Sequence, residues 1–387
     1  MKLSATAAGL ETSLTRQLFN RAEQLENVID LTLGDPDLTP SQRIRDAAKQ
    51  AVQEGRTHYS ANAGLIQARE AIAACVEQEM GIRADPASEL MLTIGGMGGL
   101  YLSLAAAVNP GDEVLIIGPY YVNYVQMTRM LGGAPVIVYT DPGEDFRIDP
   151  EKLEAAVTER TTALVLNSPC NPTGTVIDGE TLDRIAEIAR RHDLTVISDE
   201  VYKTLLYDGA RYESIITREG MRERTVLIDS MSKRFSMTGY RCGFAIGPAE
   251  IIRGMTNMQE NTASCTPLPS QYAAMEAYTA CREEHWIQDE FERRRNLMWP
   301  AVNGIPGLSC LKPAGTFYLF VNIEKTGMDS LAFATALLEE ARVAVVPGIT
   351  YGEPYDGYVR IAFTRETEAL LEAAERIRKF AGKYAQG

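Results

Sequence analysis

The stretch SMSKRFSMTGYRCGF, residues 230–244, sets Ser230 three residues before Lys233 and Arg241 eight residues after it. A hydroxyl and a planar, always charged guanidinium fork that converge from two sides suit a dianionic phosphate. A lysine beside such a phosphate is placed to hold an aldehyde cofactor. Ser230, Lys233 and Arg241 together therefore suit pyridoxal 5′-phosphate (PLP). The alternative is that Lys233 is a solvated surface lysine after a strand, where most lysines lie.

Other motifs stand along the chain in a consistent order. They are LTLGDPD (31–37), THYSANAGLIQAREAIA (57–73), TIGGMGGL (93–100), PYYVNY (119–124), NSPCNPTG (167–174), VISDEVY (196–202) and PGITYGEPYDGYVRIAF (347–363). With them the chain resembles the class I and II aminotransferases of PLP fold type I, which are similar to aspartate aminotransferase, along nearly its whole length. The resemblance implies PLP bound through a Schiff base on Lys233, L-amino acid and 2-oxo acid substrates, and a homodimer with active sites at the subunit interface.

Short apolar runs alternate with amphipathic helical patterns over the first three quarters of the chain. The runs are ELMLTI, EVLIIG, APVIVY, TALVLN, TVISDE, TVLIDS and CGFAI. Such βα units predict an α/β fold whose mostly parallel sheet is covered by helices on both faces. We expect helices near 98–108 and 179–192. The resemblance implies a seven-stranded sheet.

Two domains are expected. The large PLP-binding domain spans 46–285. The chain from about residue 286 predicts a charged helix at 289–299 and strands around TFYLFVNI and YVRIAF, which indicate a smaller α+β domain at 286–387. By resemblance, residues 1–45 join that small domain.

Composition excludes several classes of protein. The formal net charge of −14 argues against binding to nucleic acid or anionic membranes, which recruit an excess of Lys and Arg. Six scattered cysteines without a CxxC pair indicate neither a zinc site nor a disulfide framework, and favour a reducing, cytoplasmic setting. The three separated histidines offer no metal cluster, so no metal is expected. The N-terminal segment is too polar for a secretory signal or a membrane span.

Three residues are expected to tune the cofactor ring. Asp199 ends the strand TVISDE, where a carboxylate would pair with the ring nitrogen and keep it protonated. By resemblance, Tyr202 and Asn171 donate to the phenolic oxygen of PLP, and the X-Pro bonds at Pro169 and Pro172 are candidates for cis geometry. A loop cap for Asp199 and ordinary buried polar groups for the other two stay open as alternatives.

The phosphate and the ring faces need further contacts. The amides of Gly96 and Met97 open a helix after a strand, so they are expected to face the phosphate together with Ser230, Ser232 and Arg241. By resemblance, an aromatic ring stacks on the cofactor from position 121 (Tyr121), and Tyr59 reaches the phosphate of a neighbouring subunit. Packing in the core is the alternative for both tyrosines.

The substrate is expected at Arg360, in YVRIAF, which resembles the arginine that binds the α-carboxylate through a bidentate fork. A structural Asp or Glu is the alternative partner of a buried arginine. Gly34 would let that carboxylate approach the backbone. Tyr120, Tyr124 and the segment 261–266 are candidate pocket walls.

The implied reaction is ping-pong transamination, in which Lys233 moves the α-proton. A PLP-dependent β-lyase on the same fold remains an alternative, because fold does not fix reaction. A non-catalytic PLP sensor would need a basic DNA-binding segment, and none is evident. The glycine-rich loop lacks the dinucleotide fingerprint, which disfavours a dehydrogenase. Met97 argues against a dedicated aspartate enzyme, and the sequence identifies no donor.

Overall fold

Seven strands form the central sheet of the computed structural model, which describes residues 2–10 and 14–384. Their order is β2-β8-β7-β6-β5-β3-β4. The bounds are β2 Leu90–Ile94, β3 Glu113–Gly118, β4 Ala134–Tyr139, β5 Thr161–Asn167, β6 Thr195–Asp199, β7 Thr225–Ser230 and β8 Cys242–Ile246. Neighbours from β7 to β4 run parallel, and β8 is antiparallel to both β2 and β7. The expected mostly parallel seven-stranded sheet is therefore confirmed.

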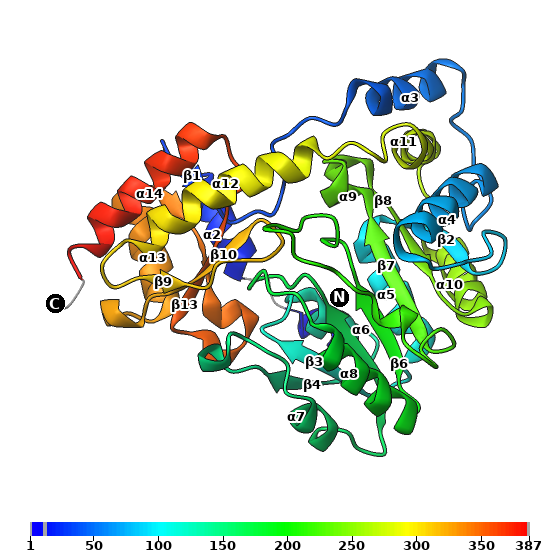
Figure 1. Ribbon diagram of the computed structural model, residues 1–387, viewed down its shortest axis with the longest axis horizontal. Helices are drawn as coiled ribbons and strands as arrows, with labels where there is room; N and C mark the ends of the chain where they lie inside the picture. Colours follow the sequence, from blue (N-terminus) through cyan, green and yellow to red (C-terminus); the bar gives the residue numbers. More distant parts are fainter. Residues whose placement is uncertain (1, 11–13, 385–387) are drawn as a thin grey trace.

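Both faces of this sheet are covered by helices (Figure 1). Alternate residues of the strands point to opposite faces, so that Val165 and Ile197 pack in one cluster while Leu164 and Val196 pack in another. One face carries α5 Gly95–Ala107, α6 Asn123–Met130 and α10 Ala249–Thr262. The other face carries α4 Ile66–Met80, α7 Pro150–Ala155, α8 Gly179–Arg191 and α11 Leu268–Thr279, with α3 Gln42–Gln53 packed on α11.

Helix α5 begins three residues earlier than the sequence pattern predicts. Gly95, with φ of 65°, turns the chain directly from β2 into the helix without a connecting loop. The backbone at Gly96 and Met97 therefore belongs to the first turn of α5, where amide N–H groups lack partners within the helix.

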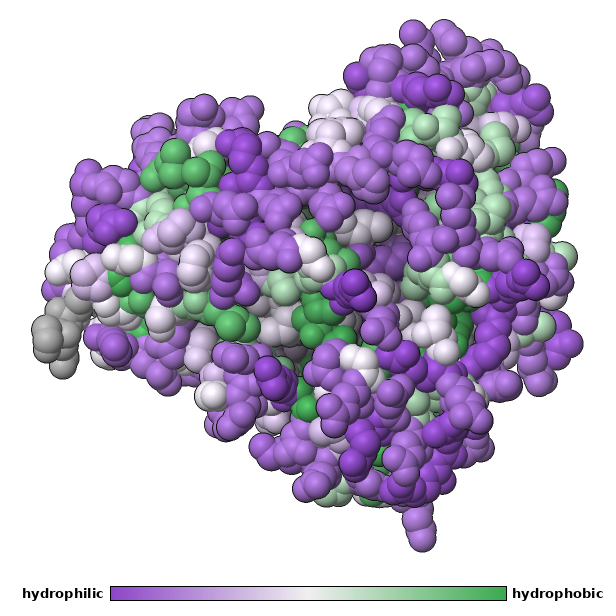
Figure 2. Space-filling model, viewed as in Figure 1, coloured by the Kyte–Doolittle hydropathy of each residue, from purple (hydrophilic) through white to green (hydrophobic). Residues whose placement is uncertain are grey.

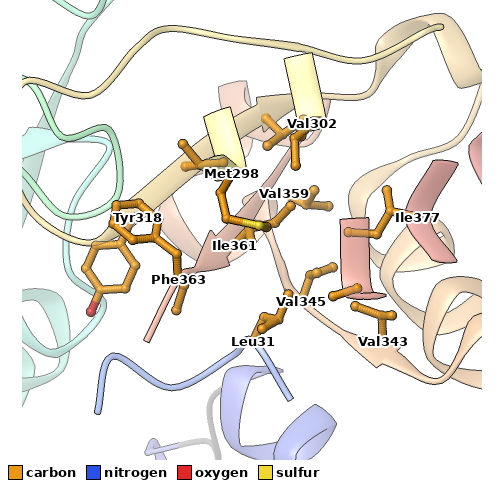
Figure 3. Close-up of a cluster of buried hydrophobic side chains, with 14 of the residues drawn as sticks. Leu31, Met298, Val302, Tyr318, Val343, Val345, Val359, Ile361, Phe363 and Ile377 are labelled. Atoms are coloured by element: carbon orange, nitrogen blue, oxygen red, sulfur yellow. The ribbon is translucent and has the colours of Figure 1, made fainter. Parts of the chain in front are cut away.

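A second, antiparallel sheet of order β12-β13-β10-β9 lies beside the first (Figure 1). Its strands are β9 Ser309–Cys310, β10 Tyr318–Asn322, β12 Val346–Pro347 and β13 Tyr358–Ala362, and its helices are α12 Trp286–Asn303, α13 Ser330–Ala341 and α14 Thr367–Ala381. Figure 3 shows their shared core, where Met298, Ile361 and Ile377 meet from α12, β13 and α14. Helix α12 is longer than predicted and continues past Pro300, because Val302 in its last turn is fully buried in that core.

The N-terminal segment crosses to this second core. It contains α1 Ala5–Ala8, α2 Leu14–Ala22 and β1 Ile29–Asp30, which pairs in parallel with β11 Val343–Ala344. Leu18 and Leu31 are buried among residues of the C-terminal part. The division at 45/46 falls within α3, whose Ile44 packs in the cluster of α4 and α11, and the domain bounds at 45/46 and 285/286 stay a prediction. In the described part of the chain, no helix has both the length and the apolar composition needed to cross a membrane.

Candidate active site

A cavity of about 470 Å³ opens at the carboxyl ends of β5, β6 and β7, between the two sheets. The face in Figure 2 is largely hydrophilic, and hydrophobic residues gather toward its hollowed centre. Twelve of the thirteen predicted site residues line the cavity: Gly34, Gly96, Met97, Tyr121, Asn171, Asp199, Tyr202, Ser230, Ser232, Lys233, Arg241 and Arg360.

The amine of Lys233 points into this cavity from the short helix α9 Met231–Arg234. Its Nζ donates a hydrogen bond to the carbonyl oxygen of Gly34 at 2.6 Å. The pKa of Lys233 is lowered to about 8, mainly by burial and also by the cations Arg360 and Arg241, while Asp35 opposes the shift. A lysine with this pKa has a much larger neutral, nucleophilic fraction near neutral pH than an ordinary lysine.

The carboxylate of Asp199 lies at the end of β6 and is 4% exposed. Tyr124 donates its hydroxyl to Oδ2 at 2.6 Å, and the amide of Val201 donates to Oδ1 at 3.4 Å. Burial raises the pKa of Asp199 to about 6, and these two hydrogen bonds limit the rise. Asp199 is thus an anion at neutral pH, and within residues 2–10 and 14–384 it forms no ion pair with a cation, which suits a site for a protonated ring nitrogen.

An anion cradle lies between the start of α5 and α9. Ser230 caps α9, since its Oγ accepts from the amide of Ser232 at 3.1 Å, and the two hydroxyls are 2.9 Å apart. A Cβ at Gly95 would be 2.7 Å from Nη2 of Arg241, so glycine leaves room for the guanidinium there. Two hydroxyls, one guanidinium and the first turn of a helix are typical of a phosphate site.

Arg360 is 5% exposed and forms no ion pair with any carboxylate that the structure describes. Its Nη1 donates to Oδ1 of Asn171 at 3.0 Å, and Nη2 donates to the carbonyl oxygen of Thr32, while Nε has no partner. The guanidinium lies 4.2 Å from the ring centroid of Tyr318. The alternative of a structural Asp or Glu partner is therefore wrong, and a buried cation in this state favours an anionic ligand.

Asn171 and Tyr202 both lie in the wall of the cavity. The amide N–H of Asn171 donates to Oδ1 of Asn167 at 2.8 Å, and the hydroxyls of Tyr202 and Tyr318 are 3.0 Å apart. The peptide bonds before Pro169 and Pro172 are cis, as predicted.

Comparison with known proteins agrees with this geometry. Residues 26–377 match the family described as aminotransferase class I and II. The chain belongs to that family. It is 42% identical to the aspartate aminotransferase of Pyrococcus abyssi, over 94% of each chain, and 40% identical to aromatic-amino-acid aminotransferase 2 of Thermococcus litoralis, over 98% of each. The solved aromatic aminotransferase of Pyrococcus horikoshii superimposes with a TM-score of 0.89 at 42% identity, over 95% of this chain and 99% of the other.

As a member of this family, the protein is a PLP-dependent transaminase of fold type I that acts on amino acids and oxo acids. The residues present fit PLP, because the cavity offers an amine, a buried unpaired carboxylate and a phosphate cradle together.

The sequence did not predict the contacts that several tyrosines make in the aminotransferase site. Tyr124, expected only as a pocket wall, holds Asp199, and Tyr318 and Tyr351 stack around Arg360. A Cβ at Gly34 would lie 1.8 Å from Oη of Tyr318. Gly34 therefore makes room for a phenol in this structure, and the predicted approach of a substrate carboxylate is not tested.

Two candidate walls lie elsewhere. Tyr120 lines a neighbouring crevice, and the segment 261–266 does not line the cavity. Just before that segment, the side-chain amide of Gln259 in α10 donates to the carbonyls of Asn62 and Leu92, which ties α10 to the loop that carries Tyr59. Tyr59 itself is 86% exposed and does not line the cavity of its own chain.

Proposed function

We propose that this chain is a ping-pong aminotransferase in which Lys233 holds PLP covalently and moves the substrate proton. The observation that carries the proposal is Arg360, a buried cation in the same cavity as the amine of Lys233, which pairs with no carboxylate among the residues that the structure describes. A substrate carboxylate at Arg360 would complete that pairing and fix the α-carbon near Nζ.

Bound PLP supplies an electron sink for negative charge at the α-carbon of the substrate. In the proposal, Asp199 keeps the ring nitrogen protonated, and Asn171 and Tyr202 donate to the phenolic oxygen. Ser230, Ser232, Arg241 and the amides of Gly96 and Met97 would hold the phosphate through hydrogen bonds, and Tyr121 would pack on the ring. In support of its role as proton carrier, Lys233 lines the same cavity as these groups, and its Nζ donates to the carbonyl oxygen of Gly34.

For the substrate, we propose a broad donor range that includes dicarboxylic and aromatic amino acids. Relatives of nearly equal identity are named for aspartate and for aromatic amino acids. The cavity combines the apolar surfaces of Met97 and Tyr121 with the cation Arg16 of α2. Replacing Arg16 with Ala should lower kcat/KM for aspartate more than for phenylalanine, because only aspartate carries a second anion.

We also propose a homodimer in which Tyr59 of one subunit contacts the phosphate site of the other. Its support is that Tyr59 is 86% exposed and lies outside the cavity of its own chain, so that its ring is accessible to a second subunit. Co-expression of Lys233→Ala and Tyr59→Ala chains tests this arrangement. Mixed dimers contain one intact site, so their activity should exceed the sum of the two variants, and no gain would place Tyr59 outside the partner's site.

The reaction is tested by following the visible absorption of the PLP-loaded protein during addition of single L-amino acids, with the released oxo acid quantified. Loss of the visible absorption band of the PLP-loaded protein, with one oxo acid released per active site, supports transamination. Lys233→Ala should abolish turnover in a folded protein, while Lys379→Ala, at an exposed lysine of α14, should not. Ammonia release without an oxo acid acceptor would support the β-lyase, and an unchanged band would support the sensor.

A further inference from the structure

A buried ion pair lies behind the active site, on the face of the central sheet that α4 and α11 cover. Lys203 follows β6 and Asp229 lies in β7, and each of the two side chains is 5% exposed. Nζ of Lys203 donates to Oδ2 of Asp229 and lies 5.6 Å from the ring centroid of Phe244, which belongs to the apolar cluster of α4 and α11. Neither member of the pair lines the cavity that contains Lys233.

Stability alone does not explain this pair. Taking two charges out of water costs free energy that their mutual attraction does not fully return, unless further hydrogen bonds satisfy them. Apolar side chains of similar volume often stabilise such a position equally well or better. The role of Lys203 and Asp229 is therefore better sought in the other groups that they contact.

Asp229 also holds the start of α9. Its Oδ1 accepts the backbone N–H of Ser230 at 2.6 Å while Oδ2 accepts from Lys203, so both carboxylate oxygens have a fixed partner. Ser230 is the N-cap of α9, because its Oγ accepts the N–H of Ser232 at 3.1 Å. The ion pair thus fixes the backbone of the residue whose hydroxyl begins the helix that carries Lys233.

Helix α9 depends on such anchors because it has only four residues, and a helix this short is not stable by itself. Its last residue, Arg234, is held by Glu79 of α4 through two hydrogen bonds of 2.8 and 2.5 Å. Asp229 holds the other end of the helix. Lys233 lies between these two anchors, so the direction of its side chain depends on both.

We propose that Lys203 and Asp229 are positioning residues for the reaction, which tie the segment that contains Tyr202 to α9. Lys203 directly follows Tyr202, and Asp229 directly precedes Ser230. The ion pair thus joins the segment that faces the cofactor ring to the segment that carries the reactive amine. This inference rests on the proposed role of Lys233, and it assigns to neither residue of the pair a contact with the cofactor.

Two double variants, both without the ion pair, test the proposal. Lys203→Met/Asp229→Leu removes the charges and also the acceptor of the Ser230 amide. Lys203→Gln/Asp229→Asn removes the charges but keeps an oxygen at position 229 for that amide, and it lets the two side chains bond to each other. Equilibrium titration of each apoprotein with PLP measures the affinity, stopped-flow absorbance measures the rate of covalent capture, and denaturant unfolding measures the stability.

We expect Lys203→Met/Asp229→Leu to match the wild-type protein in stability, because apolar side chains replace a buried ion pair well. It should nevertheless bind PLP at least about tenfold more weakly and capture it at least about tenfold more slowly, because a buried amide loses its partner. Lys203→Gln/Asp229→Asn should resemble the wild-type protein in both. Glu113→Leu/Arg160→Met is the matched control, since it removes an ion pair at the amino end of β3 and should alter neither quantity.

Wild-type affinity and capture rate in Lys203→Met/Asp229→Leu would overturn the proposal. Equal losses in the two double variants would also overturn it, because the hydrogen bond to Ser230 would then not be what matters. Failure of the wild-type protein itself to capture PLP would instead contradict the proposed function. If the apolar variant does not fold, Lys203→Leu/Asp229→Val is judged by the same criteria, since a β-branched residue suits strand β7.

Discussion

The hydroxyl of Tyr124 lies 2.6 Å from Oδ2 of Asp199, deep at the end of the central sheet. Burial raises the pKa of Asp199, and the phenol counters this by donating to the charged form. The result is a pKa of about 6, so that Asp199 remains an anion at neutral pH.

We expect the affinity for PLP to weaken as the pH falls through about 6. The raised pKa means that the Asp199 carboxylate exists above this pH and is protonated below it, where it no longer attracts the ring nitrogen. Asp199→Asn is uncharged at every pH, so the difference between the two affinity profiles isolates Asp199. Equilibrium titrations of the apoprotein across the pH range measure both, and parallel profiles would contradict the assignment.

Tyr124→Phe should move that pH dependence upward. A hydrogen bond to a buried charge is worth about 1.5–3 kcal/mol, which corresponds to a rise of about one to two units in the pKa of Asp199. The same titrations with PLP measure the shift. Tyr101→Phe is the control, since Tyr101 packs against the same core cluster without touching Asp199.

Covalent capture of PLP by the apoprotein should accelerate as the pH rises through about 8. Only the neutral amine attacks an aldehyde, and burial has lowered the pKa of Lys233 to about 8, whereas an ordinary lysine titrates near ~10.4. Stopped-flow absorbance at a series of pH values gives the rate profile. A midpoint near that of free lysine would show that Lys233 is not the reacting amine.

Arg360→Lys should lower kcat/KM by about 100-fold, equivalent to about 3 kcal/mol for a lost charge-assisted hydrogen bond. A lysine keeps the charge but cannot form the planar fork. The loss should be similar for every donor, because each carries the α-carboxylate. Arg365→Lys, at a half-exposed arginine nearby in sequence, should leave kcat/KM almost unchanged.

Gly243→Ala should destabilise the protein by about 2–3 kcal/mol and weaken PLP binding. A Cβ there would lie 2.6 Å from the carbonyl carbon of Gly95 and 2.8 Å from the amide nitrogen of Gly96, which are backbone atoms at the start of α5. Gly254→Ala within α10 meets no atom and should stabilise by about 0.5–1 kcal/mol. Denaturant unfolding compares the two, and equal effects would contradict the steric argument.

Much of the fold follows from local pattern. Alternation of β-branched runs with amphipathic helices predicted all seven central strands, because a strand buried on both faces must be apolar throughout. The ends of the helices were predicted less accurately from the sequence. The start of α5 depends on a positive φ at Gly95, and the extension of α12 past Pro300 depends on burial of Val302 in a distant core.

The sequence by itself determined the family, the amine at Lys233 and the arginine at Arg360, because their motifs have fixed spacings along the chain. Only the tertiary structure decided which groups surround them. Tyr124 meets Asp199 across 75 residues, and Asn171 meets Arg360 across 189. Such contacts arise where strand ends and loops of two sheets converge, and no local pattern encodes which side chains then come within hydrogen-bonding distance.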